Sequence, residues 1–121
     1  MSIERIALGK KGEELVARFL EQAGFSILEQ NYSIKQGEID IIARKEEVLA
    51  FVEVKLRRNP LFSLSELIVP SKQRKIVTTA LWYINKHNFQ DMIYRFDVAL
   101  VEGTQTDYTI NYIENAFTAS Y

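Results

Sequence analysis

The sequence predicts an α/β fold in which a mixed β-sheet is flanked by helices, with the element order α-β-β-β-α-β-β. Three observations predict this class. Two segments carry apolar side chains at helical spacing, and five shorter segments have the apolar content of strands. In addition, 121 residues with 47% apolar and 26% charged side chains are enough for one hydrophobic core and too few for two. Residues 1–121 are therefore expected to form a single domain.

The first half of the chain is expected to form one helix and then three strands. The helix carries its apolar residues at helical spacing and is followed by Gly24, a residue that suits a helix end. A turn near Gly37 and a hairpin tip at Glu46 and Glu47 separate the strands. The expected helix covers residues 6–23, and the expected strands cover residues 25–32, 38–44 and 48–57.

The second half begins with an irregular stretch that contains Pro60 and Pro70. Ser71 then offers a helix N-cap, and an apolar stripe with helical period follows until His87 or Asn88. The remaining elements are strands at residues 92–101 and 108–114, with a turn around Gly103 between them.

The charge is unevenly distributed although the net charge is only −1. Residues 55–75 contain six basic residues and one acidic residue, Glu66. A basic segment that follows a carboxylate cluster is what a phosphate-handling site needs, and a solvated loop with a helix start would look similar. The basic residues are Lys55, Arg57, Arg58, Lys72, Arg74 and Lys75.

The composition also excludes several classes of protein. The longest apolar run is far shorter than the ~20 residues of a membrane span, and the N-terminal sequence lacks the apolar stretch of a signal peptide. The absence of cysteine excludes disulfides and thiolate metal sites. A soluble protein in the cytoplasm is therefore expected.

Charged residues interrupt the two strands at 38–44 and 48–57. Side chains alternate between the two faces of a strand, so Glu53 is expected on the same face as the apolar residues 49 and 51. In the preceding strand, one face is expected to carry Glu38, Asp40 and Ile42, and the other face Ile39 and Ile41. If the hairpin pairs Lys45 with Val48, Asp40 falls opposite Glu53, with Cβ atoms ~5 Å apart. A register shifted by two residues would instead bring Glu38 closest to Glu53.

Two carboxylates at this spacing on a half-buried face repel each other, which is usually resolved by a raised pKa or by a bound cation. Oxygen ligands without Cys or a nearby His favour Mg²⁺ or Mn²⁺ over zinc. Lys55 lies two residues beyond Glu53 on the same side, where it could offset the acids, contact a phosphate, or position and deprotonate a water. Together these residues fit metal-assisted hydrolysis of a phosphodiester.

These residues also carry a resemblance to a known family. Asp40 in "GEIDIIA" followed by "VEVK" resembles the bipartite D...ExK motif of the PD-(D/E)xK nuclease superfamily. The wider set, "GKKGEELVARFLEQAGFSILEQNY", "FVEVK", "SKQRKI", "YRFDVALV" and "YIENAF", resembles the small bacterial YraN-like family of predicted endonucleases, related to archaeal Holliday junction resolvases. The match extends from about Gly9 to Phe117.

The resemblance implies a restriction-endonuclease-like core and a role for each matching residue. Asp40 and Glu53 would bind Mg²⁺ or Mn²⁺ with the backbone carbonyl of Val54, and Lys55 would be the catalytic lysine. The resemblance also implies a role for Glu13, as an acid added to the site from the first helix, and for Gln73, as a polar residue beside the lysine. Glu38 would be an accessory or competing ligand, because the motif reads "EID" instead of "PD".

The resemblance further implies that the protein is a DNA endonuclease that favours branched or structured DNA. A four-way junction has two-fold symmetry, which suits a homodimer with two sites, and Leu61, Phe62 and Leu64 are candidates for its interface. Tyr112 is a departure, because a His is expected there in much of the family. This departure affects only a peripheral role.

Each assignment has an alternative. The three acids could be solvated strand carboxylates, Lys55 could form a salt bridge only, and the basic residues could be a solvated face instead of a phosphate-backbone track. His87 suits a helix C-terminal cap better than a catalyst. Two other functions stay open, a nucleic-acid-binding module with an idle nuclease site and an acid-pair hydrolase acting on glycosides, although Lys55 and the basic segment argue against the latter.

Overall fold

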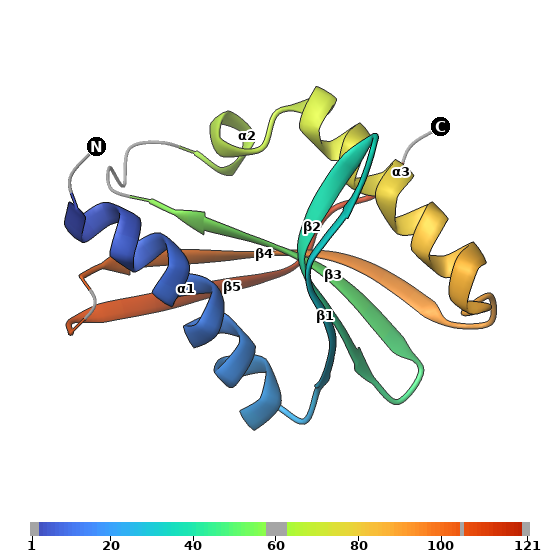
Figure 1. The fold of residues 1–121 in the computed structure, drawn as a ribbon, viewed down its shortest axis with the longest axis horizontal. Coiled ribbons are helices and arrows are strands. Elements are labelled where there is room, and N and C mark those ends of the chain that lie inside the picture. The colour runs from blue at the N-terminus through green and yellow to red at the C-terminus, as the bar shows by residue number, and fades with distance from the viewer. Residues whose placement is uncertain (1–2, 58–62, 105, 120–121) are drawn as a thin grey trace.

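The computed structural model describes residues 3–57, 63–104 and 106–119, except for the side chains of residues 3–10. Within these ranges five strands form one sheet in the order β1-β2-β3-β4-β5. The order of the elements along the chain confirms the predicted mixed α/β fold (Figure 1). The helices are α1 (Ile3–Gln22), α2 (Leu64–Leu67) and α3 (Pro70–His87), and the strands are β1 (Ser26–Ile34), β2 (Gly37–Lys45), β3 (Val48–Leu56), β4 (Ile93–Gly103) and β5 (Tyr108–Phe117).

The sheet is mixed because one of its four strand pairs is parallel. β1, β2 and β3 form an antiparallel meander, β3 and β4 are parallel, and β5 returns antiparallel to β4. The parallel pair requires a long crossover connection, and this connection contains α2 and α3. β3 therefore lies at the centre of the sheet, as its apolar residues on both faces predict.

Helices cover both faces of the sheet. On one face Val16, Ala17 and Leu20 of α1 pack against a fully buried cluster that includes Val52 of β3. On the other face α3 packs against a second cluster that includes Phe51, the neighbour of Val52 on the same strand. The two-sided burial explains why β3 tolerates few polar residues before its end.

The expected alternation in β2 is wrong at one position. Ile39 and Ile41 were expected on one face and Ile42 on the other, but Ile41 packs on the α1 side of the sheet whereas Ile39 joins Ile42 in the cluster under α3. The period of two breaks between Ile39 and Ile41, at Asp40, where β2 ceases to pair with β3. At this point the Asp40 carboxylate accepts the Val54 N–H, while β2 continues to pair with β1.

The start of α3 and the segment before it also differ from the prediction. A short helix, α2, lies in the stretch that was expected to be irregular. The N-cap of α3 is Val69, with Pro70 at the first helical position, so the prediction of Ser71 as the N-cap is wrong. Proline suits that position because its fixed φ is helical and its missing N–H would have had no helical partner.

The end of α3 agrees with the prediction. His87 is the last helical residue, and Asn88 caps the helix in the left-handed conformation, with φ of 58°. The His87 ring packs 4.3 Å from the Tyr83 ring, measured between centroids. His87 thus lies in the last turn of α3, consistent with a structural role at the helix end.

Candidate active site

The predicted hairpin register is confirmed up to the point where the acids begin. Lys45 pairs with Val48, and the paired positions continue to Ile41 opposite Val52. Asp40 comes next in the register opposite Glu53, but the strands no longer pair there. Instead, the Asp40 carboxylate accepts a hydrogen bond of 2.8 Å from the Val54 N–H. The alternative register that brings Glu38 opposite Glu53 is excluded.

Glu53 is a buried acid that two lysines approach. Its side chain is 7% exposed, and Lys72 Nζ lies 2.9 Å from Glu53 Oε1. Lys55 Nζ lies 3.8 Å from the same oxygen. Lys55 is contributed by the same strand as Glu53, whereas Lys72 is contributed by the first turn of α3. The crossover that carries α3 therefore brings a second ammonium group to the acid.

The electrostatic effects show that these groups form one cluster. Burial raises the pKa of Asp40 from its ordinary value of 3.8 to about 6, with further increases from Glu13 and Glu38, against the Val54 N–H and Lys72, which lower it. Burial and then the charge of Asp40 raise the pKa of Glu53. Burial and the neighbouring Lys72 lower the pKa of Lys55. The two acids are thus costly to ionise in this place.

The other acids predicted for the site lie at its edge. Glu13 is half-buried on α1, and Glu38 is exposed at the start of β2. The negative charge of each raises the pKa of Asp40, so both lie close enough to influence the acid pair. The roles that the resemblance implies for them stay predictions.

Gln73 has a local partner. Its side-chain Nε2 donates a hydrogen bond of 3.1 Å to the backbone carbonyl of Ile68, which joins the end of α2 to the start of α3. This bond fixes the first turn of α3, the turn that also carries Lys72. The expected place of Gln73 beside Lys55 stays a prediction.

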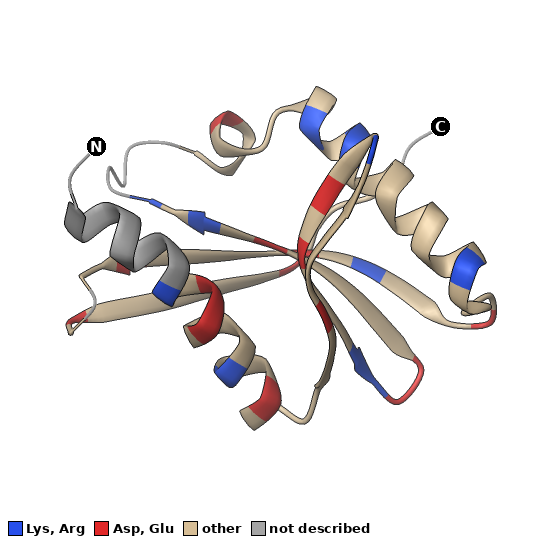
Figure 2. Ribbon diagram, in the orientation of Figure 1, with Lys and Arg blue, Asp and Glu red and all other residues tan. Residues whose placement is uncertain are grey.

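The predicted phosphate track is divided among several environments. Lys72 is half-exposed, whereas Arg74 and Lys75 are exposed on the first two turns of α3. Arg57 forms an ion pair of 2.7 Å with Glu102 of β4, and its side chain is 19% exposed. Arg58 lies outside the described residues. Figure 2 shows basic residues at the start of α3 and at the end of β3.

The carboxylates of Asp40 and Glu53 supply part of the oxygen ligand set that a hard divalent cation needs. The buried Glu53 and the half-buried Asp40 both have raised pKa values, through desolvation and, for Glu53, through the charge of Asp40. Such a cation would neutralise this pair. Within the part of the chain that the structure describes, however, no three His, Asp or Glu side chains converge. Among the described residues, a cation here would therefore have the acids Asp40 and Glu53 as its first ligands and would complete its shell with the backbone and water, as Mg²⁺ commonly does.

Sequence reasoning missed a second buried acid, Asp97 on β4. Its carboxylate is fully buried and accepts hydrogen bonds from Arg95 Nε at 3.0 Å, from the Tyr112 hydroxyl at 2.6 Å and from the Asn115 N–H at 3.0 Å. The clue in the sequence is a charged residue within the apolar run "FDVALV", with Arg95 two positions earlier on the same face. Tyr112, which stands where a His was expected, thus has a structural partner.

The predicted dimer contact is only partly described. Leu64 is half-buried and packs against the cluster of Ile68, Val98 and Leu100 under α2. Leu61 and Phe62 lie outside the described residues. The homodimer therefore stays a prediction.

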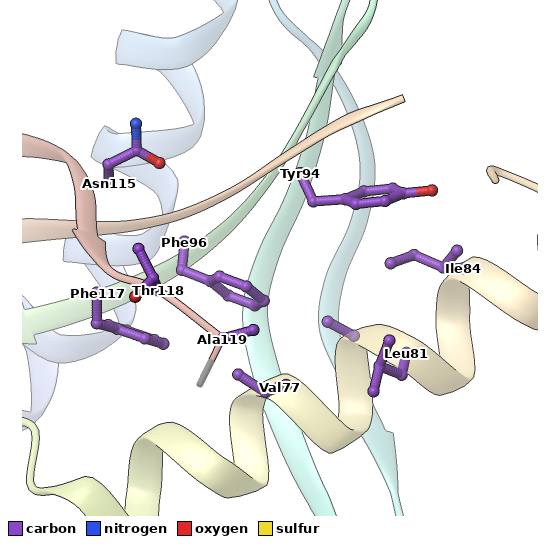
Figure 3. A pocket seen from close by; sticks show the side chains of 10 residues that line it. Val77, Leu81, Ile84, Tyr94, Phe96, Asn115, Phe117, Thr118 and Ala119 are labelled. Carbon is purple, nitrogen blue, oxygen red and sulfur yellow. The ribbon is translucent and has the colours of Figure 1, made fainter. Parts of the chain in front are cut away.

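An apolar cavity of about 250 Å³ lies between α3, β4 and the end of β5 (Figure 3). Val77, Leu81 and Ile84 line it from the helix, and Phe96 and Phe117 line it from the strands. Neither Asp40 nor Glu53 lines it, so this cavity is separate from the acid cluster. None of the described helices combines the length and the apolar character needed to cross a membrane.

Comparisons with known proteins identify the family. The profile of the uncharacterised protein family UPF0102 matches residues 12–101, a range that includes the acid pair and both lysines. A UPF0102 protein of Syntrophus aciditrophicus is 41% identical over 119 residues, which cover 98% of this chain and 94% of that protein. A UPF0102 protein of Geotalea daltonii is 44% identical, over 94% of this chain and 91% of that protein, and one of Clostridium perfringens is 39% identical, over 92% and 93%. This chain therefore belongs to the uncharacterised protein family UPF0102.

Proposed function

We propose that this protein is a metal-dependent DNA endonuclease that hydrolyses phosphodiester bonds in branched or otherwise structured DNA. The observation that supports this most directly is the acid pair of Asp40 and Glu53, with two lysine ammonium groups within 4 Å of Glu53. Desolvation makes these two acids costly to ionise, as their raised pKa values reflect, and groups with such perturbed pKa values are typical of functional sites.

The residues would divide the work of hydrolysis among them. Mg²⁺ or Mn²⁺, when bound, would supply polarisation of the phosphoryl oxygen and activation of water, and Asp40 and Glu53 would hold it. Lys55 Nζ would orient the attacking water and take up its proton, a role that burial and the neighbouring Lys72 favour because they lower the pKa of Lys55. The water oxygen would bond to phosphorus as one phosphorus–oxygen ester bond breaks.

The preference for structured DNA rests on the resemblance to Holliday junction resolvases alone. A two-fold symmetric junction would be served by a homodimer that places one acid cluster on each of two strands. The basic residues near the acid cluster, Lys72, Arg74 and Lys75, would contact the phosphates on either side of the scissile bond.

The experiment is a cleavage assay on labelled duplex, single-stranded, flap and four-way-junction DNA, with Mg²⁺, with Mn²⁺ and with chelator. Wild type is compared with Glu53→Ala and Lys55→Ala, and Glu47→Ala at the exposed hairpin tip serves as the matched acid control. We expect cleavage that requires metal, is lost by at least two orders of magnitude in the two site variants and persists in Glu47→Ala.

A second function is favoured by one observation. The Glu53 carboxylate is paired with Lys72 at 2.9 Å, as it would be in a nucleic-acid-binding module with an idle site. Well-folded wild type that binds the junction in chelator and cleaves none of the four DNAs would overturn the endonuclease proposal in favour of this module.

A further inference from the structure

We propose that Lys72 is the counter-ion of the acid pair and forms an ion pair with Glu53 before a metal binds. A divalent cation then displaces the Lys72 ammonium group from Glu53. The released ammonium group binds a phosphate of the nucleic acid. This inference deepens the proposed function and rests on its metal site. It concerns a lysine on α3 and not Lys55, the lysine of the D...ExK motif.

The contacts at Glu53 identify Lys72 as the main counter-ion. Both ammonium groups approach Oε1, but Lys72 lies at hydrogen-bond distance, 2.9 Å, while Lys55 lies at 3.8 Å. A carboxylate oxygen that binds a divalent cation cannot keep an ammonium group at 2.9 Å without strong repulsion between the two positive charges. Binding of a metal to Glu53 Oε1 therefore requires Lys72 to move.

The position of Lys72 on its helix makes this movement feasible. Lys72 is the third residue of α3, after Pro70 and Ser71, and the first turn of α3 contains no acidic residue. A positive charge is unfavourable at a helix N-terminus, so the helix itself does not hold the ammonium group there. The Lys72 side chain is 38% exposed, whereas that of Lys55 is 26% exposed, so Lys72 has more room to move into solvent.

The same position gives the released lysine a second partner. The partial positive charge at the start of α3 and the Lys72 ammonium group would both favour an anion, and a nucleic-acid phosphate beside the acid pair is the anion that the proposed function supplies. Lys72 would therefore exchange partners. Before the metal binds it neutralises Glu53, and after the metal binds it neutralises a phosphate. Lys72 would thus keep the empty site stable and contribute to substrate binding once the metal is present.

The test measures metal binding without DNA. Metal-stripped wild type, Lys72→Gln, Lys72→Arg and Glu53→Gln are titrated with Mn²⁺ by isothermal titration calorimetry. Lys86→Gln is the matched control, because it removes the same charge from an exposed position on the same helix. We expect Lys72→Gln to bind Mn²⁺ about fivefold more tightly than wild type, Lys72→Arg and Lys86→Gln to resemble wild type, and Glu53→Gln to lose binding.

The outcomes separate this proposal from the proposed function. Equal Mn²⁺ affinities for wild type and Lys72→Gln, both dependent on Glu53, would overturn the exchange and leave the endonuclease proposal intact. Absence of any Glu53-dependent Mn²⁺ binding would overturn both. Tighter binding by Lys72→Gln in a protein that cleaves no DNA would support the exchange and refute only the endonuclease.

Discussion

Asp40 is the residue whose environment most clearly opposes its charge. Burial raises its pKa to about 6, although the Val54 N–H donates to its carboxylate. Because the folded-state pKa lies above the ordinary value of 3.8, the native state binds more protons than the unfolded state between these two pH values. The free energy of unfolding of the metal-free protein therefore falls as the pH rises from about 4 to about 6, and the penalty is complete above that range.

The fall in the free energy of unfolding with rising pH gives a prediction for Asp40→Asn. The amide keeps an oxygen that can accept the Val54 N–H, and it cannot ionise. We expect the variant to be more stable than wild type by about 1–3 kcal/mol at pH 8 in chelator, and equal to wild type near pH 4. Urea denaturation at the two pH values measures this difference, and an equal difference at both would contradict the assigned cause.

Asp97 is the opposite case, a buried acid with a complete set of partners. Arg95, Tyr112 and the Asn115 N–H all donate to it, so one carboxylate joins the two C-terminal strands. Asp97→Ala would remove the buried partner of a largely buried guanidinium group and leave it only the exposed Glu114 at 3.7 Å. We expect this change to lower the free energy of unfolding by about 3–5 kcal/mol. Tyr112→Phe removes one donor only, and we expect a loss of about 1–2 kcal/mol.

Thermal and urea unfolding of these two variants, with circular dichroism to check the fold, tests the assignment. A Tyr112→Phe variant as unstable as Asp97→Ala would show that the tyrosine hydroxyl, and not the acid, holds the network together. Since this network lies on the α1 face while Glu53 lies on the α3 face, neither change is expected to act on the acid pair directly.

At the scale of the elements, the close contact of β2 with α3 sets the position of Lys72. A Cβ atom at Gly37 would lie 2.8 Å from Thr79 Oγ1 and 3.2 Å from the Lys75 carbonyl oxygen, and Thr79 is fully buried. A Cβ atom at Gly37 would therefore clash with the buried Thr79 hydroxyl and crowd the helix backbone at Lys75. Gly37→Ala is expected to cost about 1–3 kcal/mol of stability and to weaken Glu53-dependent Mn²⁺ binding, because α3 must shift.

Gly12 on α1 supplies the matched control for this prediction. A Cβ atom there would meet its nearest neighbour, Leu56 Cδ2, at 3.5 Å, an ordinary van der Waals contact. Gly12→Ala is therefore expected to raise the stability by up to ~1 kcal/mol through helix propensity. Urea denaturation of both variants measures these changes in stability. A Gly12→Ala variant that is less stable than wild type, or a Gly37→Ala variant that is as stable as wild type, would contradict the prediction.

The sequence predicts elements well where one local pattern determines them. The helical periodicity before Gly24 and the alternation around the 46–47 tip predicted α1 and the β2–β3 register correctly. The same rules failed where tertiary contacts compete with local preference. Ile39 changes face because β2 separates from β3 at Asp40, and Val69 caps α3 because Pro70 begins the helix one residue before the favoured Ser71.

At the scale of the whole molecule, the candidate site was predictable only in the part that one hairpin builds. Asp40, Glu53 and Lys55 lie within 16 residues of sequence and two paired strands, so spacing alone brings them together. Lys72 reaches Glu53 through the crossover between β3 and β4. No local pattern specifies where such a crossover places its helix, and sequence reasoning therefore assigned Lys72 to the phosphate track alone.

Attraction of the whole molecule to a polyanion must come from the distribution of its charges, because the net charge is −1. Arg74 and Lys75 are exposed at the start of α3, near the acid cluster, and Lys86 is exposed at the other end of the same helix. Each phosphate contact releases about one counterion. Arg74→Gln and Lys75→Gln are therefore each expected to lower the slope of log affinity against log salt concentration by ~1, and Lys86→Gln to leave it unchanged.

Fluorescence anisotropy with a labelled four-way junction in chelator, between low and moderate salt, measures these slopes without interference from cleavage. The comparison is internal to one helix, because all three changes remove one positive charge and leave the core untouched. Slopes that fall equally for all three variants would mean that the nucleic acid responds to total charge and not to the start of α3. A fall confined to Arg74→Gln and Lys75→Gln would place the phosphate backbone across the helix start, where Lys72 meets Glu53.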